Sequence, residues 1–254
     1  MLLAVDIGNT HTVIGVFEED SLLHHWRTAS DLARTEDEIF VMLKFLLEEH
    51  GIKRSDLKGA AISSVVPDLT PVLKIMCKKY FQVEPLVINA LVKLNFEVKY
   101  NNPSAVGADR ICNAAAAIER YGAPLVIIDF GTATTFDCID KSGNYSGGII
   151  APGIASSIET LHKKAAKLPS VDMVFPEEII GHTTEESIQS GIMIGTSVMI
   201  DGMVRRLKDE LGKQTKIVAT GGLARKVAGR TECIDEVNPF LSLEGIASIY
   251  RLNS

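Results

Sequence analysis

Two short segments of the chain carry an aspartate followed by glycine and hydroxyl side chains. The first, Val5 to Thr12, reads VDIGNTHT, and the second, Ile128 to Thr135, reads IDFGTATT. Each follows a short apolar run and precedes more apolar residues, which predicts a strand, a tight turn and a second strand. A carboxylate at the end of a strand can hold magnesium while phosphate oxygens supply other ligands. Backbone amides around the glycine and nearby threonine hydroxyls can bind phosphate oxygens.

Either segment alone would be interpreted as an ordinary turn, because Asp followed by Gly is common turn chemistry. Two matching segments, Asp6 to Thr12 and Asp129 to Thr135, instead favour two related half-molecules that bind one nucleotide. The chain has no G-x-x-x-x-G-K-[ST] element and no G-x-G-x-x-G loop after a strand. The sequence therefore argues against a P-loop enzyme and against a standard dinucleotide-binding protein.

A third candidate site is the tetrapeptide Gly107 to Arg110, which reads GADR, at the start of an alanine-rich helix. Asp109 could simply favour the helix dipole, whereas Arg110 opposes it. An acid and a base together could also serve a small substrate. Asp109 would then accept a hydroxyl proton and Arg110 would bind a carboxylate. The spacing alone leaves both interpretations open.

Three further groups of small residues each have a structural and a functional interpretation. Gly221 and Gly222 follow a predicted strand, where they form a tight turn or let a ribose or flat ring approach the backbone. Thr183 and Thr184 cap a helix or face a ligand. The glycines of that helix permit close helix packing, within the fold or at a dimer interface; they are Gly191, Gly195 and Gly202.

These residues must be positioned by alternating strands and helices, so we expect an α/β fold. Apolar periodicity predicts strands at 2–5, 12–17, 24–28, 59–66, 85–88, 125–129, 134–139, 145–150 and 217–219. Helices are predicted at 35–49, 69–80, 108–121, 154–166 and 184–211, after 222, and at 242–251. We expect two domains, residues 1–117 and 118–254.

Composition narrows the class of protein. The net charge is 26 − 32 = −6, which does not favour nucleic-acid binding. The four cysteines lie far apart without metal-ligand or redox spacing, so we expect reduced packing residues. An early Asp6 argues against a signal peptide, and no apolar run reaches the ~20 residues of a membrane span. We expect a cytoplasmic protein without a membrane partner.

Taken together, the motifs resemble those of type III pantothenate kinases. DIGNT at Asp6–Thr10 and DFGTATT at Asp129–Thr135 are similar to that family's phosphate loops, and GADR at Gly107–Arg110 is similar to its substrate motif. A Gly-Gly at 147–148 and a Pro-Gly at 152–153 also match, and the resemblance runs from Leu3 to about Ile249. The loops alone are typical of the whole superfamily of actin, heat-shock ATPases and sugar kinases. The GADR element narrows the resemblance to this family.

The resemblance implies two actin-like, ribonuclease H-like domains with mixed sheets flanked by helices, and a nucleotide in the interdomain cleft. It implies an ATP-dependent kinase that phosphorylates the primary hydroxyl of pantothenate, the first step of coenzyme A biosynthesis. A homodimer with the substrate site at its interface is also implied.

The same resemblance assigns roles to residues. Asp109 would be the general base. Asp129 would bind potassium or ammonium, and Asp6 would serve magnesium directly or through water. The expected ATP-binding residues are Asp6, Ile7, Gly8, Asn9, Thr10, His11, Thr12, Val13, Thr132, Gly221 and Gly222. The expected pantothenate-binding residues are Tyr100, Gly107, Ala108, Asp109, Arg110 and Thr184.

Two other functions remain open from the sequence. One is a kinase or phosphatase of the same superfamily with another small substrate, against which the GADR element argues. The other is a non-catalytic accessory or regulatory relative. Such a protein could lose its catalytic carboxylates, whereas Asp6, Asp109 and Asp129 are all present.

Overall fold

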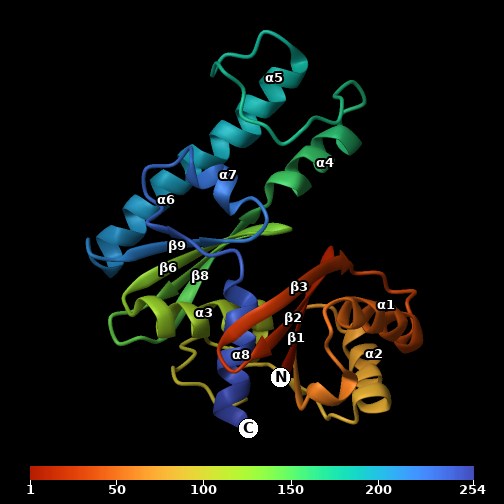
Figure 1. Cartoon of the computed structure of the whole chain (residues 1–254). Coiled ribbons are helices and arrows are strands. Elements are labelled where there is room, and N and C mark those ends of the chain that lie inside the picture. The colour runs from red at the N-terminus through yellow and green to blue at the C-terminus, as the bar shows by residue number, and fades with distance from the viewer. The chain divides into compact units, whose positions relative to one another are not determined.

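The computed structural model describes residues 1–254, which form two compact units (Figure 1). The first unit contains Met1–Glu119 together with Leu241–Ser254, and the second contains Arg120–Phe240. The predicted domains, 1–117 and 118–254, differ from these units at the C-terminus. The closing helix contacts strands of the first sheet, so it packs with the first unit. No helix of the chain has both the length and the apolar character that a membrane span needs.

The first unit contains a five-stranded mixed sheet with the order β3-β2-β1-β4-β5. Strands β1, β2 and β3 are antiparallel, whereas β4 and β5 run parallel to β1. The bounds are β1 (Leu2–Ile7), β2 (His11–Glu18), β3 (Ser21–Ala29), β4 (Gly59–Ser64) and β5 (Leu86–Val87). Register pairs Asp6 of β1 with Val13 of β2 and with Ser63 of β4.

Helices cover both faces of this sheet (Figure 1). Helices α1 (Glu36–Glu49) and α2 (Leu69–Met76) bury one face in a continuous apolar core. Helix α8 (Leu241–Asn253) contacts β1, β2 and β4. The predicted capping box at the start of α1 is confirmed, because Thr35 and Glu38 bond reciprocally. Helix α3 (Ala108–Tyr121) begins at the GADR element, and the remaining short helices are η1 (Arg54–Asp56), η2 (Cys77–Phe81) and η3 (Pro103–Ala105).

The second unit repeats this topology. Its sheet has the order β10-β9-β6-β7-β8, so β6, β7, β8, β9 and β10 occupy the places of β1 to β5. The bounds are β6 (Leu125–Phe130), β7 (Ala133–Ile139), β8 (Tyr145–Pro152), β9 (Lys216–Thr220) and β10 (Glu236–Val237). The matching strand order supports the interpretation of the two aspartate segments as halves of one duplicated unit.

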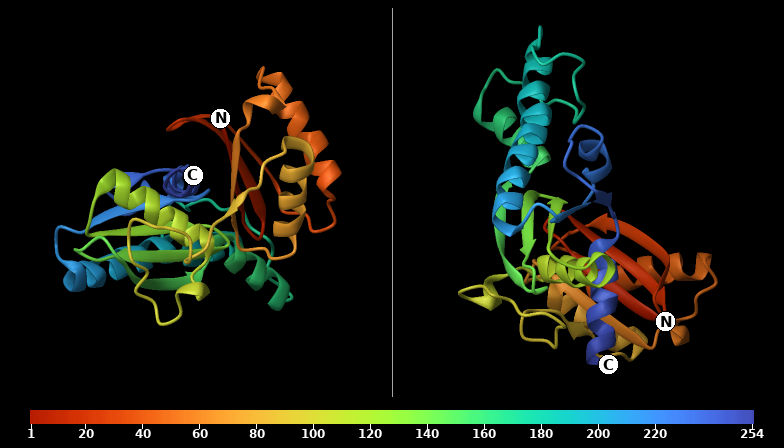
Figure 2. Two further views of the ribbon diagram at one scale, coloured as in Figure 1. Left: turned by 90° about the horizontal axis from the view of Figure 1, so that it is seen from below. Right: turned by 90° about the vertical axis from the view of Figure 1, so that its left-hand side faces the viewer.

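Four helices bury one face of the second sheet in its own apolar core. They are α4 (Ile154–Lys164), α5 (Thr184–Gln189), α6 (Gly195–Leu211) and α7 (Ala224–Ala228). The predicted long helix at 184–211 is confirmed, with a π-helical turn, η4 (Ser190–Ile194), between α5 and α6. Figure 2 shows α5 and α6 as one long rod, and α4 contacts its π-helical turn.

Candidate active site

The first phosphate loop, Gly8 to Thr10, joins β1 to β2. The amide of Gly8 donates to the His11 carbonyl at 3.0 Å, which closes the turn. Ser30, at the end of β3, braces the loop. Its hydroxyl donates to the Gly8 carbonyl at 2.6 Å, and its amide donates to the Thr10 carbonyl at 3.0 Å. The loop is therefore held by hydrogen bonds from behind, which pre-organises its amides for a phosphate.

The second loop, Gly131 and Thr132, joins β6 to β7 and is one residue shorter. The amide of Gly131 donates to the Ala133 carbonyl at 3.0 Å. Gly153 lies so close that a Cβ there would stand 2.3 Å from the Thr132 carbonyl oxygen. Ser156, in the first turn of α4, donates to the same oxygen at 2.7 Å. The N-terminal end of α4, the positive end of its dipole, therefore lies beside this loop.

Asp6 lies at the end of β1, on the sheet face that α8 covers. Ser63 of β4 donates to Asp6 Oδ1 at 2.9 Å, and the Ser242 side chain also hydrogen-bonds Asp6. Burial and the nearby charge of Asp109 raise the pKa of Asp6 from 3.8 to about 6, against the lowering effect of both serines. This carboxylate is therefore costly to ionise until a cation binds it.

Asp109 lies in the first turn of α3, and its charge acts on Asp6, so the structure brings the GADR element and the first loop together in one unit. Burial raises the pKa of Asp109, whereas the amide and the charge of Arg110 lower it. Gly107 leaves room for this side chain, since a Cβ there would stand 2.4 Å from Asp109 Oδ1. A partly buried carboxylate with a raised pKa is suited to general-base chemistry.

A close contact between two helices explains why α3 and α8 both reach Asp6. A Cβ on Gly245 of α8 would stand 1.8 Å from the Cys112 carbonyl oxygen of α3. Only glycine permits this approach. Ser242 and Asp109 each lie three residues from the contact, towards the N-terminus of their own helix.

In the second unit, Asp129 and Gly221 form a tight pair. Gly221 has φ +90°, and a Cβ there would stand 2.5 Å from Asp129 Oδ1 and 2.7 Å from the Phe130 carbonyl oxygen. Two oxygens thus converge on one small space. Gly221, which the sequence assigned either to a tight turn or to the approach of a ribose or flat ring, also leaves room for the Asp129 side chain.

The structure shows the surroundings of several candidate site residues, which the spacing of the motifs could not indicate. The Thr12 hydroxyl bonds Ser30 at 2.9 Å, so it braces the first loop. The Thr134 hydroxyl is buried among the core residues of the second unit. Thr183 caps α5 through Glu186, which leaves the exposed Thr184 hydroxyl available for a ligand. Tyr100 is exposed in the irregular segment before α3.

Four serines that support the loops and Asp6 were missed by sequence reasoning: Ser30, Ser63, Ser156 and Ser242. None belongs to a motif, and a single serine carries no sequence signal of its own. Ser30 and Ser156 have the same role in the two units, because each donates a hydrogen bond to a carbonyl oxygen of a phosphate loop. The repeated loop motif is the one sequence feature that could have prompted a search for such a pair.

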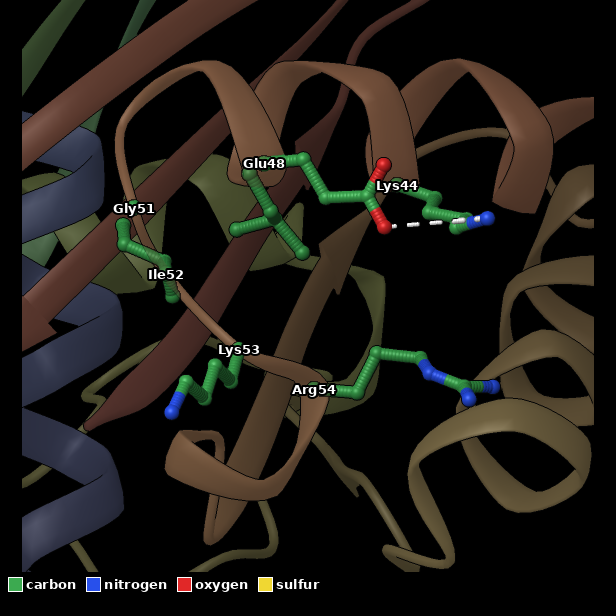
Figure 3. A pocket seen from close by; sticks show the side chains of 7 residues that line it. Lys44, Glu48, Gly51, Ile52, Lys53 and Arg54 are labelled. Atoms are coloured by element: carbon green, nitrogen blue, oxygen red, sulfur yellow. Dashed lines mark ion pairs between the residues drawn. The ribbon is translucent and has the colours of Figure 1, made fainter.

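A cavity of about 350 Å³ in the first unit lies away from these residues, at the C-terminal end of α1 (Figure 3). It is lined by Lys44, Leu47, Glu48, Gly51, Ile52, Lys53 and Arg54. These residues lead towards the start of β4, which is parallel to β1, whereas the phosphate loop follows the end of β1. The cavity is therefore at the opposite end of the sheet from Asp6, and Lys44 within it is paired with Glu48 at 3.6 Å.

Comparison with known proteins agrees with this geometry. A family model described as type III pantothenate kinase matches residues 2–206. A type III pantothenate kinase of Halalkalibacterium halodurans is 45% identical over 253 residues, which cover 100% of both chains. The chain belongs to the type III pantothenate kinase family. The Asp6 and Asp129 loops and the GADR element all lie within the region that the family model matches.

Solved structures show the fold that this pantothenate kinase family member shares with more distant proteins. One is described as a Baf family transcriptional activator from Campylobacter jejuni, with a TM-score of 0.63 and 19% identity over 99% of this chain and 98% of that one. Another is the activator of 2-hydroxyisocaproyl-CoA dehydratase from Clostridium difficile, with a TM-score of 0.55 and 16% identity over 98% and 93%. The predicted actin-like α/β fold, with mixed sheets flanked by helices, is confirmed.

The donor set of this family member suits the expected ions. Magnesium prefers one or two carboxylates together with phosphates and water, rather than a cage of protein ligands. Asp6, with Asp109 nearby, supplies such a carboxylate, and the chain shows no cluster of three or more metal-binding side chains. The Asp129 carboxylate and the Phe130 carbonyl are the oxygen donors that a larger monovalent cation accepts.

Proposed function

We propose that this protein is an ATP-dependent pantothenate kinase, which transfers the γ-phosphoryl group of ATP to the primary hydroxyl of pantothenate. The product is 4'-phosphopantothenate, and the reaction is the first step of coenzyme A biosynthesis. The observation that carries the proposal is that Asp109 lies close enough to Asp6 for its charge to raise the Asp6 pKa, in a chain that belongs to this family over its whole length. The proposal includes a cytoplasmic location, since the reaction consumes ATP.

In the proposed reaction Asp109 orients the pantothenate hydroxyl and takes its proton late in the transfer. Its raised pKa makes it a better base than an exposed aspartate, while the Arg110 amide keeps the carboxylate aligned at 2.8 Å. The buried Arg110 guanidinium binds the substrate carboxylate. Tyr100 and Thr184, with Gly107 and Ala108, complete the proposed pantothenate contacts.

Phosphoryl transfer needs positioning and charge neutralisation more than covalent chemistry. Asp6 holds magnesium, which neutralises negative charge on the phosphates. The loop residues Ile7 to Val13 bind phosphate oxygens through their backbone and through the Thr10 side chain. In the second unit Thr132 contacts ATP, and Gly221 and Gly222 lie at the proposed nucleoside end.

The experiment that tests this function measures ADP release from ATP and magnesium in potassium buffer, with and without pantothenate. We expect release that depends on pantothenate, and a product heavier by one phosphoryl group. A folded protein that releases no ADP would contradict the proposal. A panel of other small hydroxyl compounds would then test the remaining members of the superfamily, and no activity on any of them would favour an accessory role.

We further propose that Asp129 binds potassium or ammonium and not sodium. The phosphate loops contain no lysine, so a cation beside the second loop supplies positive charge that a P-loop lysine supplies elsewhere. Turnover in KCl or NH₄Cl should exceed turnover in NaCl at least ~10-fold, as expected when one charge-stabilising contact is lost. Initial rates at constant ionic strength measure this, with choline chloride as the baseline.

The variant Asp129→Asn is the matched test of that site. It should lose the response to potassium while its residual rate in choline chloride stays close to that of the wild type. Equal wild-type rates in sodium and potassium would remove the cation role of Asp129.

We propose that the protein forms a homodimer through the exposed side of α5 and α6. Gly191, Gly195, Val198 and Gly202 recur at intervals of four, three and four residues, as in a helix-packing seam. A Cβ on any of these three glycines would have open space around it, with nothing beyond the backbone of its own helix within 4 Å, and Val198 is 64% exposed. Four further apolar side chains of this unit are exposed: Leu161, Val174, Ile179 and Ile180.

A charge in the middle of this seam should separate the dimer. Val198→Asp should convert the protein to a monomer in sedimentation or light-scattering measurements, since an apolar interface cannot bury an unpaired carboxylate. If the substrate site includes the interface, KM for pantothenate should also rise. Val41→Asp is the control, because Val41 is similarly exposed, at 67%, but lies on a different helix, α1. A Val198→Asp variant of unchanged mass would contradict the assignment.

A further inference from the structure

One serine of β4 is buried without an obvious packing reason. Ser63 is 0% exposed, and the neighbouring buried residues of the strand are the apolar Ala60, Ala61 and Ile62. Alanine would fill almost the same space at this position. A fully buried hydroxyl is retained at a cost unless it is hydrogen-bonded, so its bonding partner indicates what it does.

The partner of Ser63 is Asp6. The two residues are opposite each other in the parallel register of β1 and β4, and the Ser63 hydroxyl donates to Asp6 Oδ1 at 2.9 Å. The Cys112 side chain, on α3, hydrogen-bonds Ser63 in turn.

The arrangement fixes one carboxylate from three elements. Ser63 of β4 and Ser242 of α8 both bond Asp6, while Cys112 of α3 holds Ser63. With no exposed surface, Ser63 itself cannot touch a substrate. Its effect must therefore pass through the Asp6 carboxylate.

We propose that Ser63 is a positioning residue, whose hydroxyl fixes the rotation of the Asp6 carboxylate so that it meets magnesium-bound ATP in a single orientation. The inference rests on the proposed role of Asp6 at the magnesium end of ATP. Residues that orient metal ligands from behind typically change metal affinity or activity about 10- to 100-fold when they are replaced.

The test compares Ser63→Ala, Ser63→Cys and Ser63→Thr with the wild type. Threonine keeps the hydroxyl, cysteine keeps the shape with a weaker donor, and alanine has no donor. Ser248→Ala is the control, because Ser248 is also buried in the first unit, at 4% exposure, on the same helix as Ser242. Calorimetry measures ATP binding over a range of free magnesium, steady-state kinetics measure turnover and both KM values, and thermal unfolding monitors the fold.

We expect Ser63→Ala to weaken magnesium-dependent ATP binding and to lower turnover by about 10-fold or more, with KM for pantothenate within about twofold. Cysteine should lie between serine and alanine, and threonine should restore most of the binding. Ser248→Ala should resemble the wild type. The order of the variants should follow donor strength and not side-chain volume.

Two results would overturn the inference. One is magnesium-dependent ATP binding by Ser63→Ala within twofold of the wild type. The other is a set of losses that follow thermal stability, with cysteine no better than alanine. If the wild type binds magnesium and ATP but does not phosphorylate pantothenate, the proposed function fails, and the calorimetry still decides the role of Ser63.

Discussion

Asp109→Asn should lower turnover by two to four orders of magnitude, the usual contribution of a general base. Asparagine has the same shape and can still accept the Arg110 amide bond, which is 2.8 Å long to Asp109 Oδ1. The start of α3 should therefore keep its geometry, while the group that takes the hydroxyl proton is gone. Steady-state kinetics should show the loss in kcat, with KM for ATP little changed.

The control for this variant is Asp68→Asn. Asp68 is exposed at the start of α2, and its side chain makes no capping hydrogen bond there. This variant should retain wild-type turnover. A protonated Asp109 cannot act as a base, so wild-type turnover should fall as the pH is lowered. Because burial raises the pKa of Asp109, this fall should begin at a higher pH than the ordinary carboxylate pKa of 3.8 would give. An Asp109→Asn enzyme with turnover within tenfold of the wild type would exclude Asp109 as the base.

Asp6→Asn should abolish magnesium-dependent turnover and, at the same time, make the protein without ligands more stable. The Asp6 pKa is raised from 3.8 to about 6, so its ionised form is disfavoured in the folded state. One pKa unit corresponds to about 1.4 kcal/mol. Neutral asparagine loses part of the strength of the bonds from Ser63 and Ser242. The net gain should therefore be about 1–2 kcal/mol in the free energy of unfolding.

The stability gained by Asp6→Asn should depend on pH. Below pH 3.8 the carboxyl is protonated in both the folded and the unfolded state, so the two proteins should be equally stable. Between pH 3.8 and about 6 the folded state binds more protons than the unfolded state, so wild-type stability from this group falls as pH rises. The advantage of the variant should therefore be complete only above about pH 6. Thermal unfolding at pH 4 and pH 7, without magnesium or ATP, measures it.

Asp37→Asn is a control with the opposite expected sign. Hydrogen bonds from Lys79 and Tyr80 lower the pKa of Asp37, so its removal should not stabilise the protein at pH 7. If Asp6→Asn were less stable than the wild type at pH 7, the interpretation of Asp6 as a carboxylate held for a cation would be wrong.

Local patterns in the sequence were sufficient for most of the fold. The capping box of Thr35 and Glu38 predicted the start of α1, and apolar runs on either side of Gly8 and Gly131 predicted the two hairpins. These features depend on residues within a few positions of one another. The repeated aspartate segments likewise predicted two units, and the identical strand order of the two sheets agrees with them.

The surroundings of the aspartates could not be predicted in this way. Ser63 reaches Asp6 only through the parallel register of two strands 57 residues apart. Ser242 reaches it because α8 returns to the first sheet, at a contact with α3 that requires Gly245. The contact between Gly221 and Asp129 likewise joins residues that are far apart in the sequence, so it could not be predicted from local patterns.

The sequence by itself therefore determined which residues are candidates for the chemistry, because motifs and periodicity are local properties of the chain. The tertiary structure decided which groups surround Asp6, and that Thr12 braces a loop while Thr183 caps a helix. Burial and hydrogen bonding depend on how distant segments pack; burial raises the pKa of Asp6 and of Asp109, and the hydrogen bonds partly oppose it.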